Sequence, residues 1–147
     1  MNLLYPKESY AIRGLAFEIY KKFRNRHKEK IYHNAFCIGL KNKGLKVEKK
    51  KRINIYYCGE KVGTYEPDIL VNDSIILEFK AKPSLSKEDI AQFWYYLKCS
   101  KYRLGFLVNF GTSNGVEIIR RVYDTARKKR EKVCERNTKK IFLHNSA

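Results

Sequence analysis

The first third of the chain carries apolar side chains at helical spacing. In residues 7–24 they recur every three or four positions. Pro6 directly precedes this stretch, and proline suits the first turn of a helix. A polar run at residues 24–26 interrupts the pattern, which then returns as far as about Asn42. The pattern therefore predicts two consecutive amphipathic helices.

From residue 45 onward the apolar positions alternate with polar ones. This spacing predicts a strand over residues 47–57, a turn at 58–61, and a second strand over 62–71. Asn72 and Asp73 form the next turn, and an apolar run at residues 74–81 predicts a third strand. Together these segments predict a three-stranded meander.

A further helix and two strands complete the expected order. Ser86 suits a helix N-cap, and Glu88 and Asp89 in the first turn favour the positive end of the helix. The helix extends to about residue 100, and strands are expected at 104–110 and 116–123. The fold class is therefore α/β (α+β), in the order ααβββαββ. We expect one domain over residues 1–130, followed by a basic C-terminal extension at 131–147.

The charge of the chain changes the picture. Its 147 residues include 32 Lys and Arg against 15 Asp and Glu, a formal net charge of +17. Residues 21–52 hold 13 basic and two acidic residues, and residues 120–140 hold ten and three. Such an excess is typical of proteins that bind polyanions, and it favours a nucleic-acid partner. Each patch can also be a solvated surface without a partner.

Membrane association is a weaker alternative. No run reaches the length of about 18 apolar residues that a membrane-spanning helix needs. The basic run at 127–130 lacks a wide apolar stripe beside it for insertion into a bilayer. The amino terminus has neither the charged nor the apolar region of a signal peptide, so we expect a cytoplasmic protein.

A short acidic series stands out against this basic background. Glu78 and Lys80 are two residues apart on an expected strand, so both side chains point to one face. Asp68 follows a proline on the preceding strand, where a bulge would aim its carboxylate at Glu78. Glu29 precedes Tyr32 and Phe36 by three and seven residues, so we expect it to face inward.

Two neighbouring carboxylates repel each other unless a cation lies between them. Mg²⁺ prefers oxygen ligands and keeps several waters, which two acidic side chains allow. Such a metal polarises a phosphoryl oxygen and activates a bound water. A lysine such as Lys80 can hold the attacking water and neutralise charge that builds on the phosphate.

Gln92 and Tyr96 extend the pattern onto the helix that follows the third strand. They are four residues apart, so they share one face of that helix. There they can bind phosphates of the nucleic acid or support Lys80. Without such a role they are ordinary residues of a helix face.

These motifs resemble the PD-(D/E)xK nuclease superfamily, and Gln92-x-x-x-Tyr96 is similar to its RecB-like branch. More closely, residues 8–128 resemble the small prokaryotic GxxExxY proteins of that superfamily. The matching stretches are Gly14-Leu-Ala-Phe-Glu-Ile-Tyr20, Val62-Gly-Thr-Tyr-Glu-Pro-Asp68, Ile76-Leu-Glu-Phe-Lys-Ala81, Gln92-Phe-Trp-Tyr-Tyr-Leu97 and Leu104-Gly-Phe-Leu-Val-Asn-Phe-Gly111.

The resemblance implies a restriction-endonuclease-like core, with a mixed central sheet flanked by helices. It also implies Mg²⁺-dependent hydrolysis of phosphodiester bonds but brings no substrate with it. We expect Mn²⁺ to substitute for Mg²⁺, and we expect DNA rather than RNA as the substrate, with single-stranded regions or ends favoured. The implied site consists of Glu29, Asp68, Glu78 and Lys80. Asp68 and Glu78 would bind the metal, with Glu29 directly or through water and with the backbone carbonyl of Phe79. A homodimer is a possible assembly.

The chain departs from the family at one position, where Arg26 replaces the glycine of the family's name motif. The fine position of Glu29 is open for that reason, and Glu29 can also be a surface carboxylate paired with lysines. His27 and His33 flank it and are alternative metal ligands. An ion-paired strand face is the plain alternative for Asp68, Glu78 and Lys80. A non-catalytic nucleic-acid-binding module that keeps the fold is the alternative function.

Overall fold

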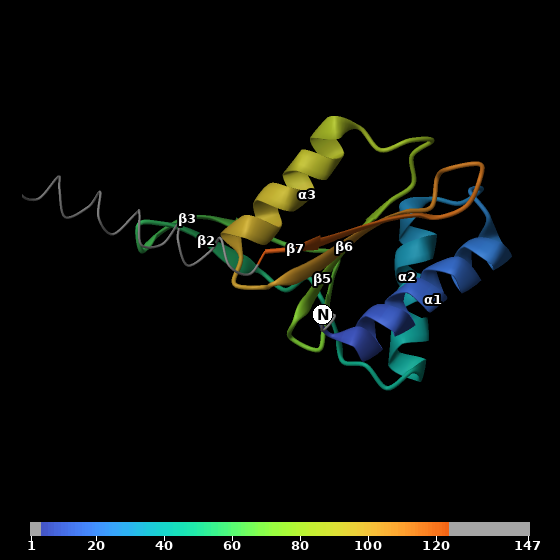
Figure 1. The fold of residues 1–147 in the computed structure, drawn as a ribbon, viewed down its shortest axis with the longest axis horizontal. Helices are drawn as coiled ribbons and strands as arrows, with labels where there is room; N and C mark the ends of the chain where they lie inside the picture. Colours follow the sequence, from blue (N-terminus) through green and yellow to red (C-terminus); the bar gives the residue numbers. More distant parts are fainter. Residues whose placement is uncertain (1–3, 124–147) are drawn as a thin grey trace, which may run out of the picture.

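The computed structural model describes residues 4–123 (Figure 1). Three helices and seven strands lie in this part of the chain. In chain order they are α1 (Pro6–Phe23), α2 (Glu29–Asn42), β1 (Val47–Lys49), β2 (Ile53–Tyr57), β3 (Glu60–Tyr65), β4 (Ile69–Val71), β5 (Ile75–Lys80), α3 (Lys87–Cys99), β6 (Leu104–Asn109) and β7 (Glu117–Val122). The expected C-terminal extension, with the domain boundary before it, lies outside the described residues.

A five-stranded mixed sheet forms the centre of the fold. Its strand order is β1-β4-β5-β6-β7, in which β5 and β6 are parallel and every other neighbouring pair is antiparallel. Helices α1 and α2 cover one face, and α3 covers the other (Figure 1). Leu77, Phe79 and Phe106 pack under α1 and α2, while Ile76 and Leu107 pack under α3. This arrangement confirms the α/β class and the mixed sheet flanked by helices.

The meander differs from the sequence prediction, because each of its first two strands is divided. The expected strand 47–57 breaks into β1 and β2 at Lys50, which has a φ of 56°, a value that does not continue a strand. The expected strand 62–71 breaks into β3 and β4 around Pro67, which has no N–H to donate to a ladder. The observed order is therefore ααβββββαββ.

The divided strands contribute to two sheets. The halves β1 and β4 join the central sheet, with Glu48 opposite Leu70. The halves β2 and β3 pair only with each other, in a two-stranded hairpin that projects from the end of the sheet (Figure 1). Ile53 and Tyr65 at the base of the hairpin are buried in the core beneath α3. The hairpin is thus anchored at the end where the chain enters β4.

Within residues 4–123, no helix is both long enough and apolar enough to cross a membrane.

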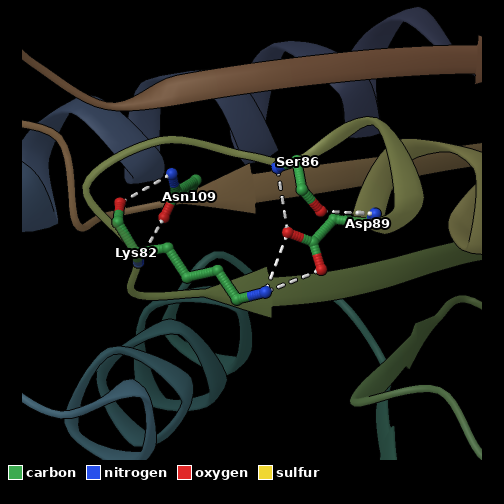
Figure 2. Close-up of polar contacts among 4 residues, drawn as sticks. All are labelled: Lys82, Ser86, Asp89 and Asn109. Atoms are coloured by element: carbon green, nitrogen blue, oxygen red, sulfur yellow. Dashed lines mark hydrogen bonds and ion pairs between the residues drawn. The ribbon is translucent and has the colours of Figure 1, made fainter.

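The segment after β5 is fixed to the sheet by a buried amide. Asn109, at the end of β6, is fully buried. Its Oδ1 accepts hydrogen bonds from the N–H groups of Lys82 (3.0 Å) and Gly111 (3.1 Å), and its Nδ2 donates to the carbonyl of Lys82 (3.0 Å; Figure 2). A Cβ on Gly111 would lie 2.2 Å from the nitrogen of Lys82, so the two backbones approach as closely as glycine allows. Asn109 therefore fixes the chain just beyond Lys80.

Replacing Asn109 with alanine is expected to lower the free energy of unfolding by about 1–3 kcal/mol, because it removes three partly buried hydrogen bonds to the backbone of Lys82 and Gly111. Urea unfolding followed by circular dichroism would measure the change. Asn54→Ala is the matched control, since Asn54 is exposed on β2 and should change stability by less than about 0.5 kcal/mol. Equal stabilities for the two variants would contradict this account of Asn109.

Candidate active site

Asp68 and Glu78 lie together where β4 begins and β5 approaches its end. The backbone N–H of Asp68 donates to Glu78 Oε1 (3.2 Å), and the backbone N–H of Phe79 donates to Asp68 Oδ2 (2.8 Å). Each carboxylate is thus held by the backbone of the strand that carries the other. The break at Pro67, rather than the expected bulge, places Asp68 here, because Asp68 precedes the first ladder pair of β4.

The two carboxylates carry like charges, which repel each other. Burial of the Glu78 carboxyl, and then the negative charge of Asp68, raise the pKa of Glu78 from 4.5 to about 8. Hydrogen bonds from the Tyr65 hydroxyl and the Asp68 N–H act in the opposite direction but do not cancel this rise. Folding therefore confines two carboxylates in a place that favours a proton or another cation between them.

The free energy of unfolding should fall as the pH rises from about 5 to about 8 in EDTA. Glu78 titrates near 4.5 in an unfolded chain and near 8 in the folded protein, so the folded state binds more protons across this window. Thermal unfolding at several pH values would show the decline, and Glu78→Gln should remove this part of it. Glu60→Gln, an exposed change on β3, serves as the control. A wild-type profile in Glu78→Gln would contradict the assignment.

Lys80 lies on the same face of β5 as Glu78, as the strand spacing predicts. Both line a pocket of about 230 Å³ between the end of β5 and α3. Gln92 and Tyr96 line the same pocket, so the structure brings four of the predicted residues together. Among residues 4–123, Lys80 Nζ makes no ion pair within 4.0 Å. Its ammonium group is therefore available to a ligand of the pocket.

Lys82, two residues further on, is held in a different way. Its Nζ contacts both carboxylate oxygens of Asp89, at 2.8 and 2.9 Å (Figure 2). Asp89 also completes a capping box with Ser86 at the start of α3, which confirms the predicted N-cap. The hydrogen bond from Lys82 lowers the pKa of Asp89 to about 2. Lys82 thus ties α3 to the end of β5.

Glu29 is placed differently from the prediction. It is the first residue of α2 and is exposed, although Tyr32 and Phe36 on its stripe are fully buried. The first turn of α2 lies beyond the end of the core. Glu29 is therefore exposed, although it shares a helix face with the buried Tyr32 and Phe36. Partial burial of its carboxyl, and then the charge of Asp68, still raise the pKa of Glu29, while Lys80 and Lys82 lower it. Glu29 therefore lies within electrostatic reach of the site.

The turn before Glu29 is fixed by Tyr32, although Arg26 stands in place of the glycine of the GxxExxY motif. The Tyr32 hydroxyl donates to the carbonyl of Arg24 and accepts from the N–H of His27 (3.2 Å). The Tyr32 ring stacks on Phe110, with centroids 4.4 Å apart. Tyr32 therefore joins the end of α1 to the start of α2, and Arg26 takes no part in these bonds.

The two histidines differ in their surroundings. The His27 ring packs edge-on against Phe23 and Tyr32. The His33 ring packs against Phe79, and burial lowers its pKa while the charge of Asp68 opposes that shift. His33 Nε2 is buried and has no hydrogen-bond partner within residues 4–123. The negative charge of Asp68 therefore reaches His33.

A hard cation fits the two carboxylates. Asp68 Oδ1 and Glu78 Oε2 accept no hydrogen bond from the described part of the chain, and both are hard oxygen donors. The Phe79 N–H faces Asp68, and the N–H and C=O of one strand residue point to the same side, so the Phe79 carbonyl faces this region as well. Within residues 4–123, no three His, Cys, Asp or Glu side chains form a complete metal cage. The donor set suits an ion that keeps several waters, as Mg²⁺ does.

Tyr65 is the residue that sequence analysis did not single out. It lies at the end of β3 and lines the pocket, and its hydroxyl donates to Glu78 Oε1. Its position three residues before Asp68 is a weak signal, because the contact depends on the break at Pro67. The predicted roles of Glu29, Asp68, Glu78, Lys80, Gln92 and Tyr96 stay predictions.

The kind of domain is identified by a comparison with known protein families. A family model described as "PD-(D/E)XK nuclease superfamily" matches residues 6–122. Among solved structures, an alkaline exonuclease (LHK-Exo) from Laribacter hongkongensis is similar, with 12% identity and a TM-score of 0.47. The match covers 99% of this chain and 86% of the exonuclease chain. None of the curated proteins searched matches this chain.

Proposed function

Because the chain belongs to the PD-(D/E)XK nuclease superfamily, we propose that it is a Mg²⁺-dependent nuclease that hydrolyses phosphodiester bonds of DNA. The observation that carries the proposal is the pair of carboxylates at the end of β5. The Glu78 carboxylate accepts a hydrogen bond from the backbone N–H of Asp68, and the Asp68 carboxylate accepts one from the backbone N–H of Phe79. Lys80 lines the adjoining pocket beside Glu78. A surface that only binds nucleic acid needs basic residues, and it does not need a pair of adjacent carboxylates among them.

Asp68 and Glu78 would hold the metal, with the Phe79 carbonyl as a third oxygen and Glu29 through water. His33, whose buried Nε2 has no hydrogen-bond partner within residues 4–123, would be a further donor on the α2 side. When bound, Mg²⁺ polarises a phosphoryl oxygen and lowers the pKa of a bound water. Asp68 and Glu78 supply the negative charge that keeps such an ion in place, and they are themselves oriented by backbone hydrogen bonds.

Lys80 would act on the attacking water and on the phosphate. Its ammonium can donate a hydrogen bond to the water oxygen and so aim it at the phosphorus atom. The same positive charge stabilises the negative charge that develops on the phosphate oxygens. Gln92, on the helix above, would bind a neighbouring phosphate from the other wall of the pocket.

Exposed basic residues directly precede Glu29 in the chain. The end of α1 and the turn before Glu29 carry five exposed cations: Lys21, Lys22, Arg24, Arg26 and Lys28. They would bind phosphates along the strand that enters the site, which fits the net charge of +17. The GxxExxY family of the RecB-like branch is the closer relationship that we propose. We further propose DNA with single-stranded regions or ends as the substrate and a possible homodimer as the assembly.

The proposal is tested by a nuclease assay on labelled single-stranded DNA, double-stranded DNA and RNA, each with Mg²⁺, Mn²⁺ or EDTA. We expect cleavage of DNA with either metal and none in EDTA, and the product ladder would separate exonuclease from endonuclease action. Binding without cleavage, with an affinity that falls steeply as salt increases, would favour the non-catalytic binding module instead.

A further inference from the structure

Tyr65 connects the projecting hairpin to the carboxylate pair. It is the last residue of β3 and is 9% exposed. Its hydroxyl donates a hydrogen bond to Glu78 Oε1, the same oxygen that accepts the backbone N–H of Asp68. Two donors from different segments therefore engage one oxygen of Glu78. The second oxygen, Oε2, receives no hydrogen bond from residues 4–123.

The ring of Tyr65 is itself held in place by α3. It stacks on the ring of Tyr96, with centroids 3.9 Å apart and planes inclined by 5°. Helix α3 is anchored beneath this contact by Phe93 and Leu97, which are buried in the core under the helix. The stack restrains the orientation of the Tyr65 ring, whose hydroxyl contacts Glu78. The result is a chain of contacts from Tyr96 through Tyr65 to Glu78.

We propose that Tyr65 is a positioning residue for Glu78, and that Tyr96 acts through Tyr65 rather than by binding a phosphate of the nucleic acid. This inference rests on the proposed function, since it assigns to Glu78 the task of binding a divalent metal. A carboxylate held through one oxygen presents the other in a single direction. Metal sites commonly use such outer hydrogen bonds to orient their ligands, and losing one weakens metal binding or activity.

The hydroxyl separates this role from simple packing. A phenylalanine at position 65 would keep the stack on Tyr96 and the contacts beneath α3, and it would lose only the bond to Glu78. Burial and the charge of Glu78 raise the pKa of the Tyr65 hydroxyl, so it remains a donor at neutral pH. A packing role therefore predicts no change in Tyr65→Phe, whereas a positioning role predicts weaker metal binding.

The experiment compares Mn²⁺ binding by titration calorimetry in wild type, Tyr65→Phe, Tyr96→Phe and Tyr96→Leu. We expect Tyr65→Phe to raise the Mn²⁺ dissociation constant about 10- to 100-fold. Tyr96→Phe should keep the wild-type constant because it keeps the stack. Tyr96→Leu removes the stacked ring and should weaken Mn²⁺ binding as well. Tyr95→Phe is the control, because Tyr95 is 58% exposed on the same helix.

Cleavage kinetics provide the second readout. Tyr65→Phe should lower kcat while the KM for nucleic acid changes by less than about threefold, since the hydroxyl acts on a metal ligand. Wild-type Mn²⁺ affinity in Tyr65→Phe, or a raised KM in Tyr96→Phe, would overturn the inference while the proposed function stands. A wild-type protein that binds no Mn²⁺ would overturn both. Melting curves in EDTA establish that each variant is folded, and Tyr96→Leu tests the contact independently of position 65.

Discussion

Replacing Asp68 with asparagine is expected to lower the rate of metal-dependent phosphodiester cleavage about 1,000-fold, the equivalent of several kcal/mol of transition-state stabilisation. The amide oxygen of asparagine can still accept the Phe79 N–H, so the backbone between β4 and β5 keeps its geometry. What the variant loses is the anionic oxygen that would bind the metal. Because asparagine has nearly the same shape as aspartate, the variant tests the effect of the charge alone.

The same substitution should not destabilise the protein. The charge of Asp68 is one of the two causes that raise the pKa of Glu78, so removing it relieves a repulsion. In EDTA at pH 8 we expect a melting temperature equal to or above that of wild type. Single-turnover cleavage and melting curves on one preparation would measure both effects. Cleavage at the wild-type rate would remove Asp68 from the site, and a large fall in melting temperature would mean that Asp68 is structural.

Lys80→Met should lower the cleavage rate about 100- to 1,000-fold, because it removes the charge that we propose to stabilise the developing phosphate oxyanion. Methionine keeps much of the length of the lysine side chain, so the pocket keeps its wall. Affinity for DNA in EDTA should change by less than about threefold, since many other cations of the +17 chain contribute to binding.

Lys82→Met is the matched control for Lys80. Both lysines leave the end of β5, but Lys82 Nζ is paired with Asp89 at 2.8 Å and is about half exposed. We expect Lys82→Met to cleave within a few-fold of wild type. Equal loss of activity in the two variants would indicate a general effect of basic charge, and unchanged cleavage in Lys80→Met would remove it from the chemistry.

The helices could be predicted from the sequence because their signals are local. Pro6 begins α1, the Ser86–Asp89 capping box begins α3, and the apolar spacing continues through each helix. The divided strands could not be predicted in the same way. Apolar residues in the same phase lie on both sides of each break, with Val47 and Ile53 around Lys50 and Tyr65 and Ile69 around Pro67. Only tertiary packing assigns the halves to different sheets.

In the candidate site, too, contacts between residues close in sequence could be predicted, and contacts between distant residues could not. Glu78 and Lys80 share a face because they are two residues apart, and this needed only the strand period. Tyr65 meets Glu78 and Tyr96 across 13 and 31 positions of the chain, and no local pattern reports such a contact. Glu29 was expected inside because its helical stripe is apolar, but helix α2 starts beyond the edge of the core.

Because side chains alternate between the two faces of β5, the effect of an inserted residue depends on where in the domain it falls. Leu77 and Phe79 face the core under α1 and α2, while Glu78 and Lys80 face the pocket. One residue inserted within β5 would exchange these faces and bury the two charged groups against the helices. The tip of the hairpin at Cys58 and Gly59 belongs to the other sheet, so an insertion there leaves β5 in register. Length variation among relatives should therefore accumulate at the hairpin and be absent from β5.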